Sequence, residues 1–234
     1  MFQSLTPSEA KKFPQGTPTI LIPFRDNQAQ DRAGQLKTFV SHMKRYHPDW
    51  TVLIIEQSDD NRKFNRGALL NVGARLAHKA GKEYVIFHDV DLIPLSPIVP
   101  YYTAFPEHPI HIGKAWTTKW SGESFLGGVM SMSIKDIRTS NGFPNMFWGW
   151  GGEDDSMRNR LKKHQIPVLQ PTMRTGFREL QHVDTRTNPD WKNMRKWEDL
   201  KEDSGQHGYR DVKWKVLQQT ELSSNIHKFI VELK

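Results

Sequence analysis

The residues best suited to chemistry in this sequence stand next to a short aromatic, glycine-rich stretch. Three consecutive carboxylates, Glu153-Asp154-Asp155, directly follow the run Trp148-Gly149-Trp150-Gly151-Gly152. Indole faces can stack on the apolar face of a sugar ring, while carboxylates bind hydroxyl groups or act as general bases. Taken alone, the three acids could be a solvated helix start on the positive end of a helix dipole. Their combination with two tryptophans and three glycines favours a ligand-binding or catalytic loop.

A second pair of carboxylates follows an apolar segment earlier in the chain. Asp89 and Asp91 come directly after the run 83–88, which has the composition of a buried strand. Side chains at i and i+2 of a strand point to the same face, so the two carboxylates are expected to converge. Convergence of this kind favours a hard cation such as Mn²⁺ or Mg²⁺. Alternatively, the Asp-x-Asp pair caps a turn before Pro94.

Two arginines follow other predicted strands. The β-branched run 19–23 leads into Phe24-Arg25, and Phe64-Asn65-Arg66 precedes a predicted helix that ends near Gly81. Open α/β sheets bind ligands at the carboxyl ends of their strands, so both arginines could face a phosphate there. Asn65 or Arg66 could instead cap the helix and balance local charge.

The elements that must position these residues alternate between strand and helix patterns. We predict a single α/β domain with a mixed sheet over residues 19–234, preceded by an N-terminal arm at 1–18. Strands are expected at 19–23, 50–57, 83–88, 124–133 and 166–170, with two late antiparallel strands at 208–217 and 227–233. Helices are expected at 30–46, from 65 to about 81, at 134–139 and at 155–163.

Composition excludes several classes of protein. The chain has 234 residues, no cysteine, and 33 Lys+Arg against 26 Asp+Glu. Without cysteine there are no disulfides or thiolate metal sites, and no apolar run is long enough to span a membrane. The basic residues are dispersed and no nucleic-acid-binding module is present, so an anionic small molecule is the favoured partner. His182 lies in a polar loop, where a surface position is the ordinary interpretation.

Several motifs occur together in one order. These are Pro23-Phe24-Arg25, Phe64-Asn65-Arg66, Asp89-Val90-Asp91, Gly127-Gly128-Val129, Asn141-Gly142-Phe143-Pro144-Asn145 and Trp148-Gly149-Trp150-Gly151-Gly152-Glu153-Asp154-Asp155. In this order they resemble the β-1,4-galactosyltransferase family, inverting family 7 glycosyltransferases of the GT-A type. The resemblance runs from about Thr19 to the C-terminus, and its Trp-Gly-rich run is highly specific.

The resemblance implies a GT-A fold that binds a UDP-sugar donor and a glycan or glycoconjugate acceptor, with Mn²⁺ (or Mg²⁺) as cofactor. It implies that Asp154 is the catalytic base. Metal ligation is implied for Asp91 and His182, which replaces the surface interpretation of His182. Donor or nucleotide contacts are implied for Pro23, Phe24, Arg25, Phe64, Arg66, Asp89, Val90, Gly128, Trp150 and Glu153. Acceptor-side roles are implied for Asp155, Phe125 and Trp148, the last on a loop that closes after donor binding.

Departures from the family pattern leave several points open. Glu179 stands three residues before His182, where relatives often have Met, and it could join the metal site or point away. Phe125 replaces a Tyr that helps to choose between galactose and N-acetylgalactosamine. Transfer of N-acetylgalactosamine, extension of a chondroitin-like or xylose-linked chain, and a non-catalytic carbohydrate-binding relative therefore remain alternatives. Because the sequence shows neither the anchor nor the disulfides of the animal Golgi enzymes, it predicts a soluble, cytoplasmic enzyme of microbial or viral origin, or a tailored catalytic fragment.

Overall fold

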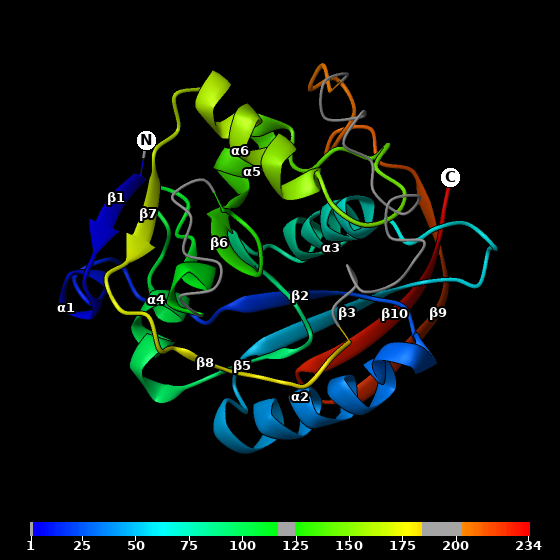
Figure 1. Cartoon of the computed structure of the whole chain (residues 1–234), viewed down its shortest axis with the longest axis horizontal. Helices are drawn as coiled ribbons and strands as arrows, with labels where there is room; N and C mark the ends of the chain where they lie inside the picture. Colours follow the sequence, from blue (N-terminus) through cyan, green and yellow to red (C-terminus); the bar gives the residue numbers. More distant parts are fainter. Residues whose placement is uncertain (1, 117–124, 184–202) are drawn as a thin grey trace.

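A six-stranded mixed sheet forms the centre of the molecule (Figure 1), in a computed structural model that describes residues 2–116, 125–183 and 203–234. The strand order is β6-β4-β2-β3-β10-β9. Strands β4, β2, β3 and β10 are parallel, and β6 and β9 are antiparallel to their neighbours at the two edges. The strands are β2 (Thr19–Phe24), β3 (Thr51–Gln57), β4 (Tyr84–His88), β6 (Val129–Ser133), β9 (Trp214–Ser223) and β10 (Ile226–Leu233). The predicted α/β class with a mixed sheet is confirmed.

Helices cover both faces of this sheet, which explains why the central strands are apolar throughout. All residues of β2 and β4 are buried. Helix α2 (Arg32–Tyr46) packs on one face through Phe39 and Met43. Helices α3 (Arg66–Lys79), α5 (Ile134–Ser140) and α6 (Glu153–Lys163) lie on the other face (Figure 1). Each face therefore has its own hydrophobic cluster.

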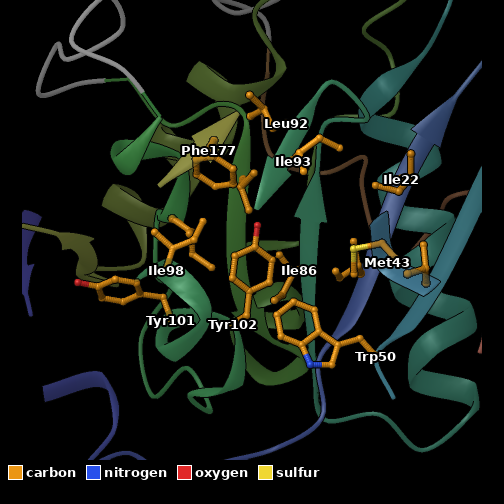
Figure 2. Packing of buried hydrophobic residues seen from close by; sticks show 14 of the residues in the cluster. Ile22, Met43, Trp50, Ile86, Leu92, Ile93, Ile98, Tyr101, Tyr102 and Phe177 are labelled. Carbon is orange, nitrogen blue, oxygen red and sulfur yellow. The ribbon is translucent and has the colours of Figure 1, made fainter. Parts of the chain in front are cut away.

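The cluster on the α2 face fixes the end of β4. Figure 2 shows Tyr102 near the centre of this cluster, beside Ile86, Ile98 and Trp50. The Tyr102 hydroxyl lies 2.8 Å from His88 Nε2, while His88 Nδ1 lies 2.8 Å from the Asp89 carbonyl oxygen. Burial lowers the pKa of His88 to about 4, so its ring is neutral at pH 7. Because a carbonyl only accepts, Nδ1 carries the proton and the ring holds the backbone at Asp89.

Two further sheets of two strands each pair segments that are distant in the sequence. Strand β1 (Phe2–Leu5) pairs in parallel with β7 (Val168–Pro171), and β5 (Leu92–Pro94) pairs antiparallel with β8 (Phe177–Glu179). The expected N-terminal arm therefore packs onto the domain, and α1 (Pro7–Ala10) begins there with a Thr6–Glu9 capping box. The remaining elements are α4 (Val99–Thr103), η1 (Gln28–Gln30), η2 (Ser96–Ile98) and η3 (Ile112–Ala115).

Several predicted boundaries were wrong by two to six residues, among them the starts of α2 and β7 and the end of the first late strand. Helix α6 begins at Glu153 and not at Asp155, so all three carboxylates stand in its first turn. The first late strand begins at Trp214 and not at Gly208, because Tyr209 N–H donates to the Asn141 carbonyl at 2.7 Å and draws that segment towards α5. Strand β6 begins at Val129, and the expected start at Ser124 lies outside the described residues.

The described ranges contain no helix that is both long enough and apolar enough to cross a membrane.

Candidate active site

The predicted site residues meet at one edge of the sheet. Strands β2, β3 and β4 all end there, and the antiparallel β6 begins there after Gly128. The Asp89 N–H donates to the Gly128 carbonyl at 3.0 Å, which holds the end of β4 against the glycine pair. A side chain at Gly127 would place its Cβ 2.6 Å from Asp154 Oδ2. The backbone of the glycine pair therefore lies directly against the carboxylate that we expect to be the base.

Arg66 joins three of the predicted site carboxylates. Its Nη2 lies 2.8 Å from Asp89 Oδ1, and its Nη1 lies 3.0 Å from Asp154 Oδ1 and 3.5 Å from Glu153 Oε1. Arg66 is the first residue of α3, after an N-cap in which Asn65 Oδ1 accepts from Ala68 N–H at 2.9 Å. The structure thus supports helix capping by Asn65 and charge balance by Arg66. The planar guanidinium thus binds Asp89 through Nη2 and the other two carboxylates through Nη1.

One guanidinium does not neutralise three carboxylates, and the pKa values of Glu153 and Asp154 are raised. Burial, followed by the charge of Asp154, raises the pKa of Glu153 to about 7. Burial is also the largest influence on Asp154 and raises its pKa, against the lowering effect of Arg66. Burial disfavours the charged form of Arg66, but Asp154, Asp89 and Glu153 outweigh it and raise the Arg66 pKa above its usual value. Asp154 is therefore a stronger base than a solvated aspartate.

A second group of side chains surrounds Asp91, where β5 and β8 pair. The Leu180 N–H donates to the Asp91 carbonyl at 2.7 Å, which brings the end of β8 to this position. His182 Nδ1 then lies 3.6 Å from Asp91 Oδ2 and 3.7 Å from Glu179 Oε1. Two carboxylates and an imidazole have the donor chemistry that Mn²⁺ accepts. Across residues 2–116, 125–183 and 203–234, however, no group of three such side chains has the geometry of a formed metal site.

Arg32 and Trp116 each contact one of these potential ligands. Arg32 Nη1 donates to Asp91 Oδ2 at 2.9 Å, so a cation on that oxygen competes with a guanidinium. Trp116 Nε1 donates to Glu179 Oε2 at 3.1 Å. Burial, followed by the neighbouring Asp89, raises the pKa of Asp91 despite the opposing effect of Arg32.

A third cluster lies in the loop that joins β3 to α3. Arg25 Nη1 donates to the Arg62 carbonyl at 2.7 Å, and the Arg25 guanidinium lies 5.8 Å from the centre of the Phe64 ring. The Arg62 guanidinium stacks over Trp148 at 4.4 Å. Gln57 organises the loop, because its Nε2 donates to Asp60 and its Oε1 accepts from the Asn65 N–H. This cluster places two cationic and two aromatic groups beside the sheet edge.

Comparisons with known proteins point to one family. Two family models match, one described as the N-terminal region of glycosyl transferase group 7 at residues 5–103 and one described as the N-terminal domain of galactosyltransferase at 107–183. Xylosylprotein 4-beta-galactosyltransferase of Caenorhabditis elegans is 31% identical over 84% of this chain and 70% of its own length. The chain belongs to glycosyltransferase group 7.

Other group 7 proteins are similar over the same region. Human β-1,4-galactosyltransferase 7 is 32% identical over 87% of this chain and 63% of its own length. A Drosophila β-1,4-galactosyltransferase 7 mutant, solved with manganese, UDP-Gal and xylobiose, is 26% identical, with a TM-score of 0.75 over 93% of this chain and 94% of that one. The chain thus spans 63% to 70% of the length of these two curated relatives. The predicted GT-A fold is confirmed.

Within this group 7 chain, some predicted residues lie apart from the carboxylate cluster. Asp155 pairs with Arg158 at 2.6 Å, whereas Arg66 pairs with Asp89, Glu153 and Asp154. Trp150 is 38% exposed, at the rim of the site. Sequence reasoning did not identify Gln57, Arg32 or Trp116, because nothing local marks a side chain whose partners come from distant segments.

The raised pKa of Glu153 predicts how stability depends on pH in the group 7 chain without ligands. The pKa rises from an ordinary 4.5 to about 7 on folding, so the folded state binds more protons between these values. The free energy of unfolding should therefore fall as pH rises through this window. In Glu153→Gln the free energy of unfolding should depend less on pH, as measured by urea denaturation from pH 4.5 to 8. Glu107→Gln, a change at an exposed residue, is the control and should keep the pH dependence of the unsubstituted chain. Identical pH profiles for Glu153→Gln and the unsubstituted chain would contradict the assignment.

Proposed function

We propose that this chain transfers galactose from UDP-galactose to a saccharide hydroxyl in a metal-dependent reaction that forms a β-linkage. The observation that carries the proposal is the carboxylate cluster around Arg66, which lies against the Gly127-Gly128 backbone at the ligand-binding edge of the sheet. The names of similar proteins support the reaction, since they are galactosyltransferases, and one was solved with manganese and UDP-Gal.

The base in this reaction is Asp154. An acceptor hydroxyl has a pKa far above neutrality, so it needs a group that removes its proton during attack on the anomeric carbon. The Asp154 side chain is 29% exposed and pairs with Arg66 at 3.0 Å. Asp154 stands in the first turn of α6, where the helix dipole favours a negative charge. A single displacement from the face opposite UDP converts an α-linked donor into a β-linked product. Arg66 and Glu153 orient Asp154 and set its basicity.

The donor lies at the sheet edge in this proposal. Phe64 and Arg25 hold the nucleotide beside the buried Pro23 and Phe24, and Asp89, Val90 and Gly128 line the sugar. Trp148 and Trp150 enclose the site from the Gly-rich loop, and Asp155 faces the acceptor. Asp91 and His182, joined by Glu179, would hold the cation. Bound Mn²⁺ supplies positive charge to the diphosphate leaving group.

The acceptor we propose is a xylose-terminated saccharide. The support is that a similar protein is named xylosylprotein 4-beta-galactosyltransferase and that the Drosophila structure contains xylobiose. We assign Phe125 to the donor-sugar side of the site, and its support is that a Cβ on Gly127 would lie 2.8 Å from the Phe125 ring and 2.6 Å from Asp154 Oδ2. Its missing hydroxyl makes UDP-N-acetylgalactosamine the second donor to test. The expectation of a microbial or viral, cytoplasmic enzyme has no support in the comparisons, since the similar proteins from Caenorhabditis elegans, human and Drosophila are animal proteins.

The test is release of UDP in the presence of Mn²⁺ from UDP-galactose, UDP-N-acetylgalactosamine, UDP-glucose and UDP-xylose, with xylosides and N-acetylglucosamine as acceptors. Release from UDP-galactose that depends on both the metal and a xyloside is the expected result. Absence of both turnover and UDP binding would refute the proposal. If only UDP-N-acetylgalactosamine releases UDP, the proposed donor UDP-galactose is wrong and UDP-N-acetylgalactosamine is the donor.

Substitution of the proposed metal ligands should weaken cation binding directly. We expect Asp91→Asn and His182→Ala each to lower Mn²⁺ affinity at least about tenfold, since loss of one ligand leaves too few donors. Glu179→Ala should lower affinity for Mg²⁺ more than for Mn²⁺, because a hard cation depends more on carboxylate oxygen. The measurement is titration calorimetry with UDP present, and Glu107→Gln is the control. Unchanged Mn²⁺ affinity in Asp91→Asn would contradict the assignment.

A further inference from the structure

The side chain of Asn71 makes all its hydrogen bonds with the segment that leads into the Gly-rich loop. Asn71 lies on α3 and is completely buried. Its Oδ1 accepts from the Phe143 N–H at 3.0 Å, and its Nδ2 donates to the Phe143 carbonyl at 2.7 Å and to Asn145 Oδ1 at 2.8 Å. The amide thus pairs with both backbone groups of Phe143, as a neighbouring strand would.

Other residues of α3 strengthen this attachment. Asn65, the N-cap of α3, donates from Nδ2 to the Asn145 carbonyl at 2.7 Å. A Cβ at Gly67 would lie 2.8 Å from the Pro144 carbonyl oxygen, which leaves no space between the helix and the segment. The Phe143 ring packs edge-on against Phe87 at the end of β4, with 5.0 Å between ring centres. The start of the loop is therefore fixed to α3 and to the sheet.

The end of the loop is attached to the same helix. Arg66, in the first turn of α3, binds Glu153 and Asp154. Between the two attachments, Gly149, Gly151 and Gly152 have φ values of 115°, 95° and 92°, a region that glycine adopts without strain. Arg66 and Asn71 are five residues apart, about 7.5 Å along the helix. Both ends of the loop are thus attached to one helix, while its middle is held by the Gly149 N–H bond to the Phe64 carbonyl at 2.8 Å and by the stacking of Arg62 on Trp148.

We propose that Asn71 is a positioning residue for the transfer reaction. By fixing Phe143 to α3, it sets where the Gly-rich loop begins and so places the Asp154 carboxylate against the donor edge. The inference rests on the proposed function, since it assigns Asn71 a role in the same reaction. Asn71 acts only through the backbone of Phe143 and the side chain of Asn145.

The test variant is Asn71→Asp, which keeps the size of the side chain and the acceptor for the Phe143 N–H. It replaces the Nδ2 donor with a carboxylate oxygen, which cannot donate to the Phe143 carbonyl or to Asn145 Oδ1. We expect kcat to fall at least about tenfold because a misplaced base loses rate steeply, while the Kd for UDP stays unchanged. Amide hydrogen exchange across residues 143–152 should become faster. Val52→Ala, a buried change at the far end of β3, is the control that lowers thermal stability while keeping kcat and loop exchange.

A purely structural role would give a different result. If Asn71→Asp lowers the melting temperature as Val52→Ala does but keeps the kcat of the unsubstituted chain, the proposal is overturned. If Asn71→Asp does not fold, the second variant is Asn145→Ala. It removes the bond from Asn71 together with the Asn145 bonds to Gly208 and Asp211, and it leaves the Phe143 pairing intact. It should show a smaller fall in kcat with an unchanged Kd for UDP. An unchanged kcat in Asn145→Ala would then overturn it. Absence of turnover in the unsubstituted chain would refute the proposed function, whereas the exchange measurement would still test the attachment.

Discussion

Asp154→Asn is expected to lower kcat by about 100- to 10,000-fold, because the substituted amide cannot take the proton of the acceptor hydroxyl. Asparagine has nearly the shape of aspartate, and its amide oxygen can still accept from Arg66. The affinity for UDP should therefore remain that of the unsubstituted chain. The measurements are initial rates of UDP release with saturating donor and titration calorimetry with UDP.

The control for this variant is Asp49→Asn. Asp49 is exposed and stands just before β3, at the edge of the sheet opposite to the site, so its neutralisation should leave kcat unchanged. Near-normal turnover in Asp154→Asn would show that another group is the base. Equal losses in both variants would show an effect of net charge and not of position.

Arg66→Met is expected to lower both activity and stability. It removes the cation from Glu153, which is buried, and from Asp89 and Asp154, which are partly exposed. Loss of one partner of a fully buried ion pair typically costs about 3–5 kcal/mol of unfolding free energy, and partial exposure makes the expected cost smaller than that. Without Arg66, the pKa values of Glu153 and Asp154 rise further above their unfolded values. The folded state then binds more protons than the unfolded state, so the destabilisation should grow as pH rises. Urea denaturation at pH 5 and pH 8 measures it.

Two further variants define the role of Arg66. Arg66→Lys should recover only part of the stability, because one ammonium does not reach Asp89 and Asp154 from two sides as the guanidinium does. Arg45→Met, an exposed change on α2 across the sheet, should leave stability nearly unchanged. If Arg66→Met is as stable as the unsubstituted chain at pH 8, the carboxylate cluster is not held by this arginine.

The parts of the fold that the sequence predicted are those with local patterns. Strands β2, β3 and β4 are buried on both faces, so each appears as a continuous apolar run. Parallel strands end at one edge of the sheet, and there Arg66, which follows β3, forms an ion pair with Asp89, which follows β4. Family motifs then added Asp154 to this cluster.

The parts that the sequence did not predict depend on distant partners. Asn71 is an ordinary polar residue in a helical pattern, and only the folded chain shows that its amide pairs with Phe143, 72 residues away. The place of His182 beside Asp91 was implied only by the family resemblance, and in the structure the pairing of β5 with β8 brings the two residues together. The first late strand was misplaced because Gly208-Tyr209 is held by α5 and not by the sheet. Such contacts leave no periodic pattern.

The most direct test of the central claim is the anomeric configuration of the product formed from UDP-α-galactose, followed by proton NMR while the reaction proceeds. If Asp154 activates the acceptor for a single displacement opposite UDP, the first product seen is the β-galactoside and no α-galactoside precedes it. An α-linked product would contradict the direct displacement and with it the role assigned to Asp154.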